Sequence, residues 1–135
     1  MSFFTSLQQY SDLGLLVLRV GVGASFLVHG LSKRAMWKMQ PSEQMPKSMI
    51  SILRLLSICE PLGAIAMFVG GLVQLDAACF AIIMLGAIHF KKNVWKKKYA
   101  ENGGWELDVV LFCASVALFF LGAGAYSVDR IFFGF

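Results

Sequence analysis

A small group of ionisable residues lies within otherwise apolar stretches of this 135-residue chain. Charged side chains are costly in an apolar helix, so they are retained where they bind a ligand, move protons or pair with one another. The chemistry of the chain is therefore expected at these positions. They are Arg19, His29, Arg54, Glu60, His89, Glu106 and Asp108.

Imidazole and carboxylate groups gathered near one membrane face could exchange protons with a quinone head group or contact another substrate. They could also ligate a haem or a metal, but neither histidine has a local spacing typical of such a site, so haem is disfavoured and no metal site is predicted. Ordinary hydrogen bonding at the membrane surface is the alternative. No catalytic role is assigned; the candidates for substrate or quinone binding are Arg19, His29, Arg54, Glu60, His89 and Glu106.

Arg19 and Glu60 are expected to form an ion pair. Each lies about 11 or 12 residues from the basic loop that joins the first two apolar segments, and a helical rise of ~1.5 Å per residue puts both at a similar depth. Such a pair would hold two helices in register, or its members would contact a bound substrate or quinone. Both interpretations stay open at this point.

Four apolar segments must position these side chains, at about residues 13–31, 49–73, 75–90 and 107–124. A helix needs ~20 residues to cross a bilayer core of ~30 Å, and each segment reaches or approaches that length. The alternation of barrel strands is missing, and a backbone in lipid must satisfy its own hydrogen bonds. The sequence, with 58% hydrophobic residues, therefore predicts an all-α membrane protein: one domain, residues 1–135, formed by a four-transmembrane-helix bundle.

The second and third segments are separated only by a short polar interruption. Gly70 and Gly71 favour a tight turn there, with Asp76 as the N-cap of the next helix. The third segment is expected to be the shortest.

Basic residues predict the orientation. The first and third loops hold nine of them, and the opposite side holds Arg130 alone. The positive-inside rule then places both basic loops in the cytoplasm and both termini outside, an N-out/C-out arrangement. The nine are Lys33, Arg34, Lys38, Lys47, Lys91, Lys92, Lys96, Lys97 and Lys98.

The remaining composition limits the partners. The net charge of +4 comes mainly from these loops, so no nucleic-acid partner is expected. Three cysteines lie in apolar segments without a CxxC pair, which is typical of inert thiols. They are Cys59, Cys79 and Cys113. The bilayer is the expected surrounding, and a homodimer is a further possibility.

Seven short fragments occur in a defined order along the chain: LRVGVG (18–23), FLVHGLSK (26–33), EPLG (60–63), GGL (70–72), AIIMLGA (81–87), NGGWE (102–106) and GAGAYSVD (122–129). In this order they resemble the DoxX family of small bacterial membrane proteins. The resemblance implies a location in the bacterial cytoplasmic (inner) membrane. The resemblance implies a compact four-helix membrane protein with a polar cluster inside, formed here by Arg19, His29, Glu60 and Glu106.

The resemblance also carries two functional expectations. Members of the family are associated with membrane redox chemistry, including subunits similar to thiosulfate:quinone oxidoreductase, and wider relatives act as accessory or chaperone-like membrane proteins. The first hypothesis is a quinone-linked oxidoreductase subunit, which would receive electrons from a partner because the chain has no nucleotide motif. The alternative is a non-catalytic accessory protein that binds a partner protein. Whether the chain is itself an enzyme, and on which substrate, is left open.

Overall fold

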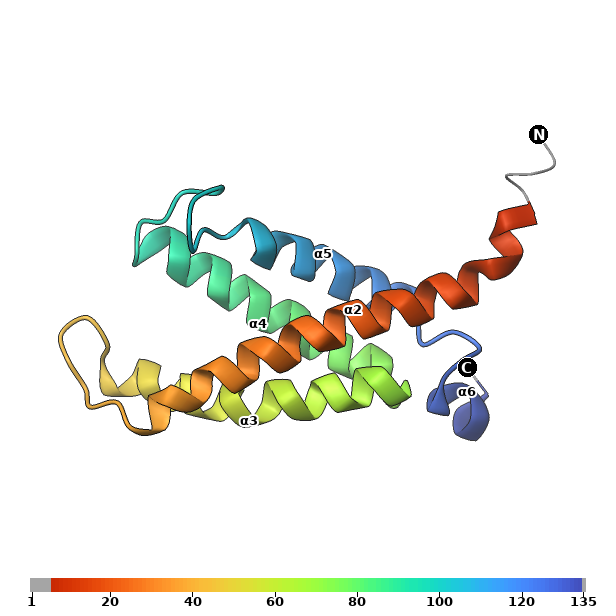
Figure 1. Cartoon of the computed structure of the whole chain (residues 1–135), viewed down its shortest axis with the longest axis horizontal. Helices are drawn as coiled ribbons and strands as arrows, with labels where there is room; N and C mark the ends of the chain where they lie inside the picture. Colours follow the sequence, from red (N-terminus) through yellow and green to blue (C-terminus); the bar gives the residue numbers. More distant parts are fainter. Residues whose placement is uncertain (1–5, 135) are drawn as a thin grey trace.

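All regular structure between residues 6 and 134, the range that the computed structural model describes, is helical. Four long helices form the body of the protein: α2 (Ser11–Ser32), α3 (Lys47–Val69), α4 (Val73–Asn93) and α5 (Glu106–Leu121) (Figure 1). The 3-10 helices η1 (Gln8–Tyr10) and η2 (Lys33–Trp37) flank α2, and the short α6 (Val128–Phe133) follows α5. The all-helical class is confirmed; the outermost residues of the predicted domain, 1–5 and 135, lie outside the described range.

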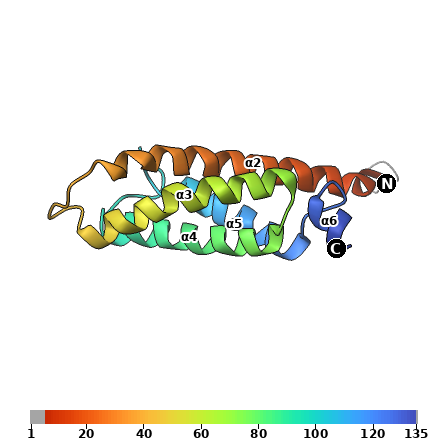
Figure 2. The ribbon, with the colours of Figure 1, turned by 90° about the horizontal axis from the view of Figure 1, so that it is seen from below.

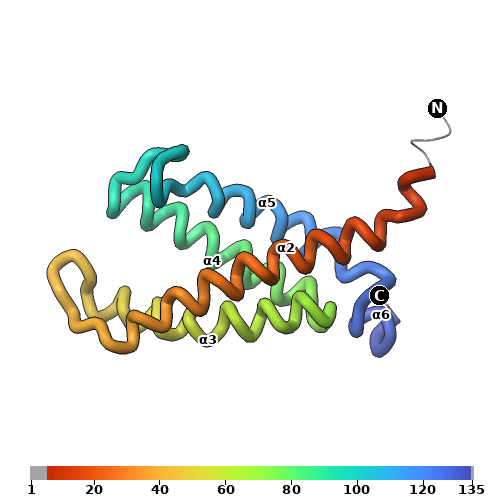
Figure 3. The backbone as a smooth tube through the Cα atoms, viewed as in Figure 1, coloured from red at the N-terminus to blue at the C-terminus, as the bar shows by residue number. Residues whose placement is uncertain are grey.

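The four long helices pair into two hairpins, α2 with α3 and α4 with α5. Both basic loops lie at one end of the molecule, which we call the loop end, whereas η1 and α6 lie at the other, the terminal end (Figures 1 and 2). Toward the loop end the two hairpins diverge, as the backbone trace in Figure 3 shows. Contact between α3 and α4 is correspondingly limited.

Helix lengths differ from the sequence expectation in one respect. The third apolar segment forms a helix of 21 residues, and α5, with 16, is the shortest of the four. Gly122, whose φ is +76°, ends α5 before the predicted boundary at residue 124. Within the described range three stretches are long and apolar enough to cross a membrane: Gln8–Trp37, Lys47–Val69 and Val73–Asn93.

The expected turn between α3 and α4 is present, but its capping residue is not the predicted one. Gly70 ends α3 with φ +72°, and an added Cβ there would overlap the guanidinium of Arg19. Asp76 lies inside the first turn of α4. The amides of Leu72 and Val73 instead donate to the carboxylate of Asp129 in α6, at 2.6 and 2.9 Å. Asp129, which is distant in sequence, therefore caps the start of α4 in place of the nearby Asp76.

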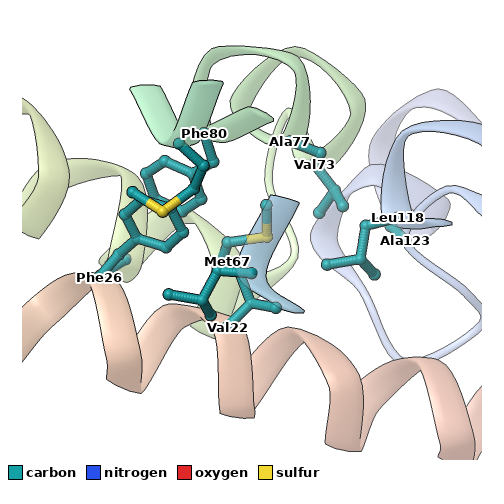
Figure 4. Packing of buried hydrophobic residues seen from close by; sticks show 11 residues of the cluster. Val22, Phe26, Met67, Val73, Ala77, Phe80, Leu118 and Ala123 are labelled. Atoms are coloured by element: carbon teal, nitrogen blue, oxygen red, sulfur yellow. The ribbon is translucent and has the colours of Figure 1, made fainter. Parts of the chain in front are cut away.

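An apolar core joins the two hairpins. Phe26 of α2 stacks on Phe80 of α4, with ring centroids 3.6 Å apart and planes within 5° of parallel, and Met67 of α3 packs beside them (Figure 4). Close approach of α2 to α3 depends on small residues, because a Cβ on Gly30 would lie 2.7 Å from Cγ of Pro61. The core therefore fixes how the hairpins meet and where they separate.

The outward faces of the long helices are apolar. Representative side chains are between 62 and 76% exposed: Val17, Leu62, Ile82 and Phe120. An apolar surface on every long helix is unfavourable in water and suits contact with lipid. The structure is that of a helical membrane protein.

Candidate ligand-binding cavity at the loop end

A cavity of about 390 Å³ lies at the loop end, where the two hairpins diverge. Its walls are mainly apolar and come from α3, α4 and the start of the following loop. The wall residues include Met49, Ile52, Leu53, Leu56, Ile83, Met84, Ala87, Phe90 and Trp95. Six polar residues complete the lining: His29, Lys33, Glu60, His89, Lys91 and Asp108. We call this space the loop-end cavity.

The first hairpin contributes one ion pair to the loop-end cavity. Lys33, the first residue of η2, donates to Oε2 of Glu60 on α3. Glu60 is fully buried, and its Oε1 has no hydrogen-bond partner among the described residues. Contact between Gly30 and Pro61 brings α2 and α3 together at this level and so places the lysine beside the carboxylate.

The second hairpin contributes an ion pair of the same kind. Nζ of Lys91, in the last turn of α4, lies 2.7 Å from Oδ2 of Asp108 in the first turn of α5. Lys91 also donates to the carbonyl of Gly104 at 3.2 Å. Asp108 is buried, whereas the lysine is partly exposed. A buried carboxylate is costly unless a cation neutralises it, and each hairpin provides that cation.

Two histidines border these pairs. His29 is half-buried and interacts electrostatically with Lys33, Lys91 and Asp108, so both ion pairs act on its ring. His89 is exposed at the edge of the cavity, where its Nδ1 lies 3.0 Å from Nδ2 of Asn93. His29 is therefore the histidine placed to contact a molecule inside the cavity.

This combination suits an amphipathic ligand with an uncharged polar group. Two lysines are balanced by two carboxylates, so the lining gives a strongly anionic head group no unpaired cation. Ammonium and imidazole groups can donate hydrogen bonds to a neutral oxygen, and the apolar walls can hold a ring or tail. Between residues 6 and 134, no group of three or more His, Cys, Asp or Glu side chains is arranged to hold a metal ion.

The predicted pair of Arg19 and Glu60 is not formed. Arg19 is buried at the terminal end, where it donates to the carbonyl of Tyr126, while Glu60 pairs with Lys33. In α2, Gly30 lies beside the level of Glu60, and eleven residues of helix, about 16 Å, separate Gly30 from Arg19.

The pairing of Arg19 with Glu60 was predicted wrongly because of the path that the chain takes between α2 and α3. The depth estimate assumed that the predicted ends of the two segments lie level, but the chain continues past α2 as η2, alongside the first turns of α3. Trp37 Nε1 donates to Oγ of Ser57 at 2.9 Å, and Arg54 Nε donates to the carbonyl of Met36 at 3.0 Å. With these contacts, Gly30 lies level with Glu60 in place of Arg19, a shift of eleven residues along α2.

The structure divides the six candidates into two groups. His29, Glu60 and His89 line the loop-end cavity. The other three lie elsewhere: Arg19 is at the terminal end, Arg54 holds the backbone of η2, and Glu106 is exposed at the first position of α5.

Sequence reasoning missed Lys33 and Lys91, which it treated only as orientation signals, and it did not carry Asp108 into the candidate list. A signal for the lysines was present. Phe26, Gly30 and Lys33 follow helical spacing along the buried side of α2, and Phe80, Met84, Ala87 and Lys91 do the same along α4. A lysine at the next position of such a row of buried residues lies on the same side of the helix and faces the interior of the bundle.

Two comparisons with known proteins found a match. The sequence model of the family described as DoxX matches residues 14–93, more than half of the chain, a range that includes Lys33, Glu60 and Lys91. A protein of Bacillus subtilis (strain 168) named "Putative oxidoreductase CatD" is 29% identical over 126 residues, which cover 90% of this chain and 89% of the relative. No solved structure matches significantly. The chain belongs to the DoxX family.

Proposed function

We propose that the protein is a quinone-binding subunit of a membrane redox system. The observation that carries the proposal is the loop-end cavity, which combines apolar walls with two internally neutralised ion pairs and His29. Its volume of about 390 Å³ falls within the range of ~300–1,000 Å³ that is common for small-molecule sites. The similarity to a protein named as an oxidoreductase supports the same class.

A quinone head group fits the lining chemically. Its carbonyl oxygens accept hydrogen bonds of the kind that Lys33, Lys91 and His29 can donate. Its reduced form carries hydroxyl groups, and Oε1 of Glu60, which has no partner in the described structure, can accept a hydrogen bond from one of them. In this proposal the chain positions the head group and exchanges protons, and a partner subunit exchanges electrons with the bound molecule.

The proposed topology is four membrane crossings with both termini outside, in the bacterial inner membrane. Helix α5 is the fourth crossing, packed along α4 with outward residues such as Phe120 exposed. Nine basic residues in the two loops favour a cytoplasmic loop end. The cavity would then lie on the cytoplasmic side of the bilayer.

A cavity-filling substitution tests the proposal. Ala87 lines the cavity, so A87W should lower the affinity for a short-chain quinone by about tenfold or more, because the indole occupies ligand space. The matched control is I82W, whose position on the same helix is exposed to the outside. Binding is measured by titration of the purified protein in lipid nanodiscs, together with quinone analysis of co-purified lipids.

Equal quinone affinity in wild type, A87W and I82W would contradict the proposed site. Wild-type protein that neither co-purifies with nor binds quinone, and that is recovered with one specific neighbouring protein, would support the accessory function instead.

A further inference from the structure

The two hairpins present the same polar arrangement to the loop-end cavity. In each, a lysine at the loop end of the first helix pairs with a carboxylate on the returning helix: Lys33 with Glu60, and Lys91 with Asp108. Side-chain exposure is also alike, at 19 and 22% for the lysines and 0 and 2% for the carboxylates. The cavity therefore has an equivalent cationic donor on each of the two hairpins that border it.

A histidine accompanies each lysine. His29 lies four residues before Lys33, and His89 lies two residues before Lys91. Both lysines line the loop-end cavity, so the two ammonium groups border one shared space. A ligand there has donors available from both hairpins.

Both lysines keep donor capacity for such a ligand. An ammonium group has three N–H donors. Within the described residues, Lys33 donates one of them to Glu60, and Lys91 donates one to the Gly104 carbonyl. Lys91 also lies 2.7 Å from Oδ2 of Asp108 as an ion pair. Each lysine therefore retains at least one free N–H donor while it still neutralises the carboxylate of its ion pair.

We propose that the loop-end cavity recognises a ring with carbonyl oxygens at opposite ends, a para-quinone, by binding one carbonyl through Lys33 and the other through Lys91. This inference rests on the proposed quinone function and adds the class of head group and the two residues that select it. The ring would bridge the hairpins, so its affinity depends on both lysines together.

The test compares a short-chain para-quinone with a monoketone of the same ring and tail in which one carbonyl carbon is replaced by a dimethyl-substituted carbon, so that the ring cannot tautomerise to a phenol. In wild type the para-quinone should bind at least about tenfold more tightly, since it gains a second charge-assisted hydrogen bond. Binding is followed in nanodiscs through quenching of Trp95, which lines the cavity, with Trp37 and Trp105 replaced by Phe.

Charge-balanced double variants then remove one of the two lysine donors at a time. Each also neutralises the partner carboxylate, so that no buried charge is left unpaired. K33M/E60Q and K91M/D108N should each weaken para-quinone binding by about tenfold or more, and monoketone binding by only about twofold, because the monoketone can use the remaining lysine. The control is K98M, which removes a lysine that does not line the cavity.

The outcomes separate this inference from the proposed function. If para-quinone binds wild type but only one double variant, or neither, weakens it, two-ended recognition is wrong while the quinone site stands. If wild type binds both compounds equally, the inference fails even where a double variant does not fold. If wild type binds neither compound, the proposed function itself fails.

Discussion

Three buried charged side chains, Glu60, Asp108 and Arg19, differ in the groups that they contact, and these contacts separate their roles. Glu60 and Asp108 are held by lysines that keep part of their side chains accessible, so each ion pair connects the interior with the membrane surface. Arg19 is fully buried and binds a backbone carbonyl of the C-terminal segment. A buried ion pair is weak evidence for stability, because desolvation offsets much of the attraction. Its position in a ligand-sized cavity is the stronger reason to assign it a function.

Glycine at position 30 is predicted to be essential for the contact that places Lys33 beside Glu60. An Ala at Gly30 would press its Cβ against the rigid ring of Pro61, whereas nothing lies within 4 Å of a Cβ at Gly21. G30A should therefore destabilise the protein by about 1–3 kcal/mol. G21A should leave stability unchanged or raise it by up to about 1 kcal/mol.

Reversible unfolding in mixed detergent micelles measures both variants, and quinone titration measures the effect on the cavity. Equal stabilities for G30A and G21A would show that α2 and α3 do not approach as closely at Pro61 as described.

At the scale of elements, the C-terminal segment closes the terminal end of the bundle. Asp129 of α6 caps the start of α4, and its own amide donates to the carbonyl of Gly70 at 2.9 Å. Asp12, in the first turn of α2, accepts from the amide of Ala125 at 2.9 Å. Together with Arg19 and the Tyr126 carbonyl, these contacts tie α6 to both hairpins. The hairpins are thus held together at the terminal end and apart at the loop end.

Removal of the Asp129 carboxylate should loosen this closure. D129A leaves the amides of Leu72 and Val73 without their acceptor, and the loss of a helix N-cap costs about 0.5–2 kcal/mol. Hydrogen exchange should become faster at these two amides. Y126F is the control, because the Tyr126 side chain is exposed and only its backbone carbonyl takes part in the closure.

Unchanged exchange at both amides in D129A would mean that α6 does not cap α4 in the membrane. Faster exchange in Y126F to the same extent would attribute the effect to a general loosening of the segment.

At the scale of the whole molecule, the two hairpins share one apolar core and border the loop-end cavity. Phe26 and Phe80 hold the hairpins together at mid-height, and the polar pairs lie beyond them toward the loops. A membrane protein needs no sealed apolar centre at every level, since lipid surrounds it. The divergence of the hairpins is therefore tolerated, and it leaves the loop-end cavity between them.

Cysteine labelling tests the arrangement of this whole molecule in the membrane. Single cysteines at Glu43, Asn102 and Tyr126, all exposed positions, report the two loops and the terminal end. With an impermeant maleimide, position 126 should react in intact cells, and positions 43 and 102 should react only after permeabilisation. The background replaces the three native cysteines, which are free and exposed: Cys59, Cys79 and Cys113.

Labelling of positions 43 and 102 from different sides would contradict the four crossings. Labelling of both in intact cells, with position 126 protected, would reverse the proposed orientation but keep the fold.

The sequence by itself determined the helical class, the family resemblance and the existence of four apolar segments, because these depend on local composition and on the order of short fragments. It also placed the turn at Gly70 and Gly71, since glycine there is a local signal. Register between helices is not local, and only the tertiary structure decided it. The path of η2 beside α3 moved Arg19 away from Glu60, and the return of α6 supplied Asp129 in place of Asp76 as a cap.

The candidate cavity was determined only in part by the sequence. An apolar helix makes any histidine or carboxylate conspicuous, so His29, Glu60 and His89 could be found from their surroundings alone. Lys33 and Lys91 lie at the junction of helix and basic loop, where a lysine that faces water and a lysine that turns inward have the same sequence context. In each hairpin, packing of the two helices turns the lysine inward toward a buried carboxylate. The direction of the lysine therefore depends on contacts between segments far apart in the chain.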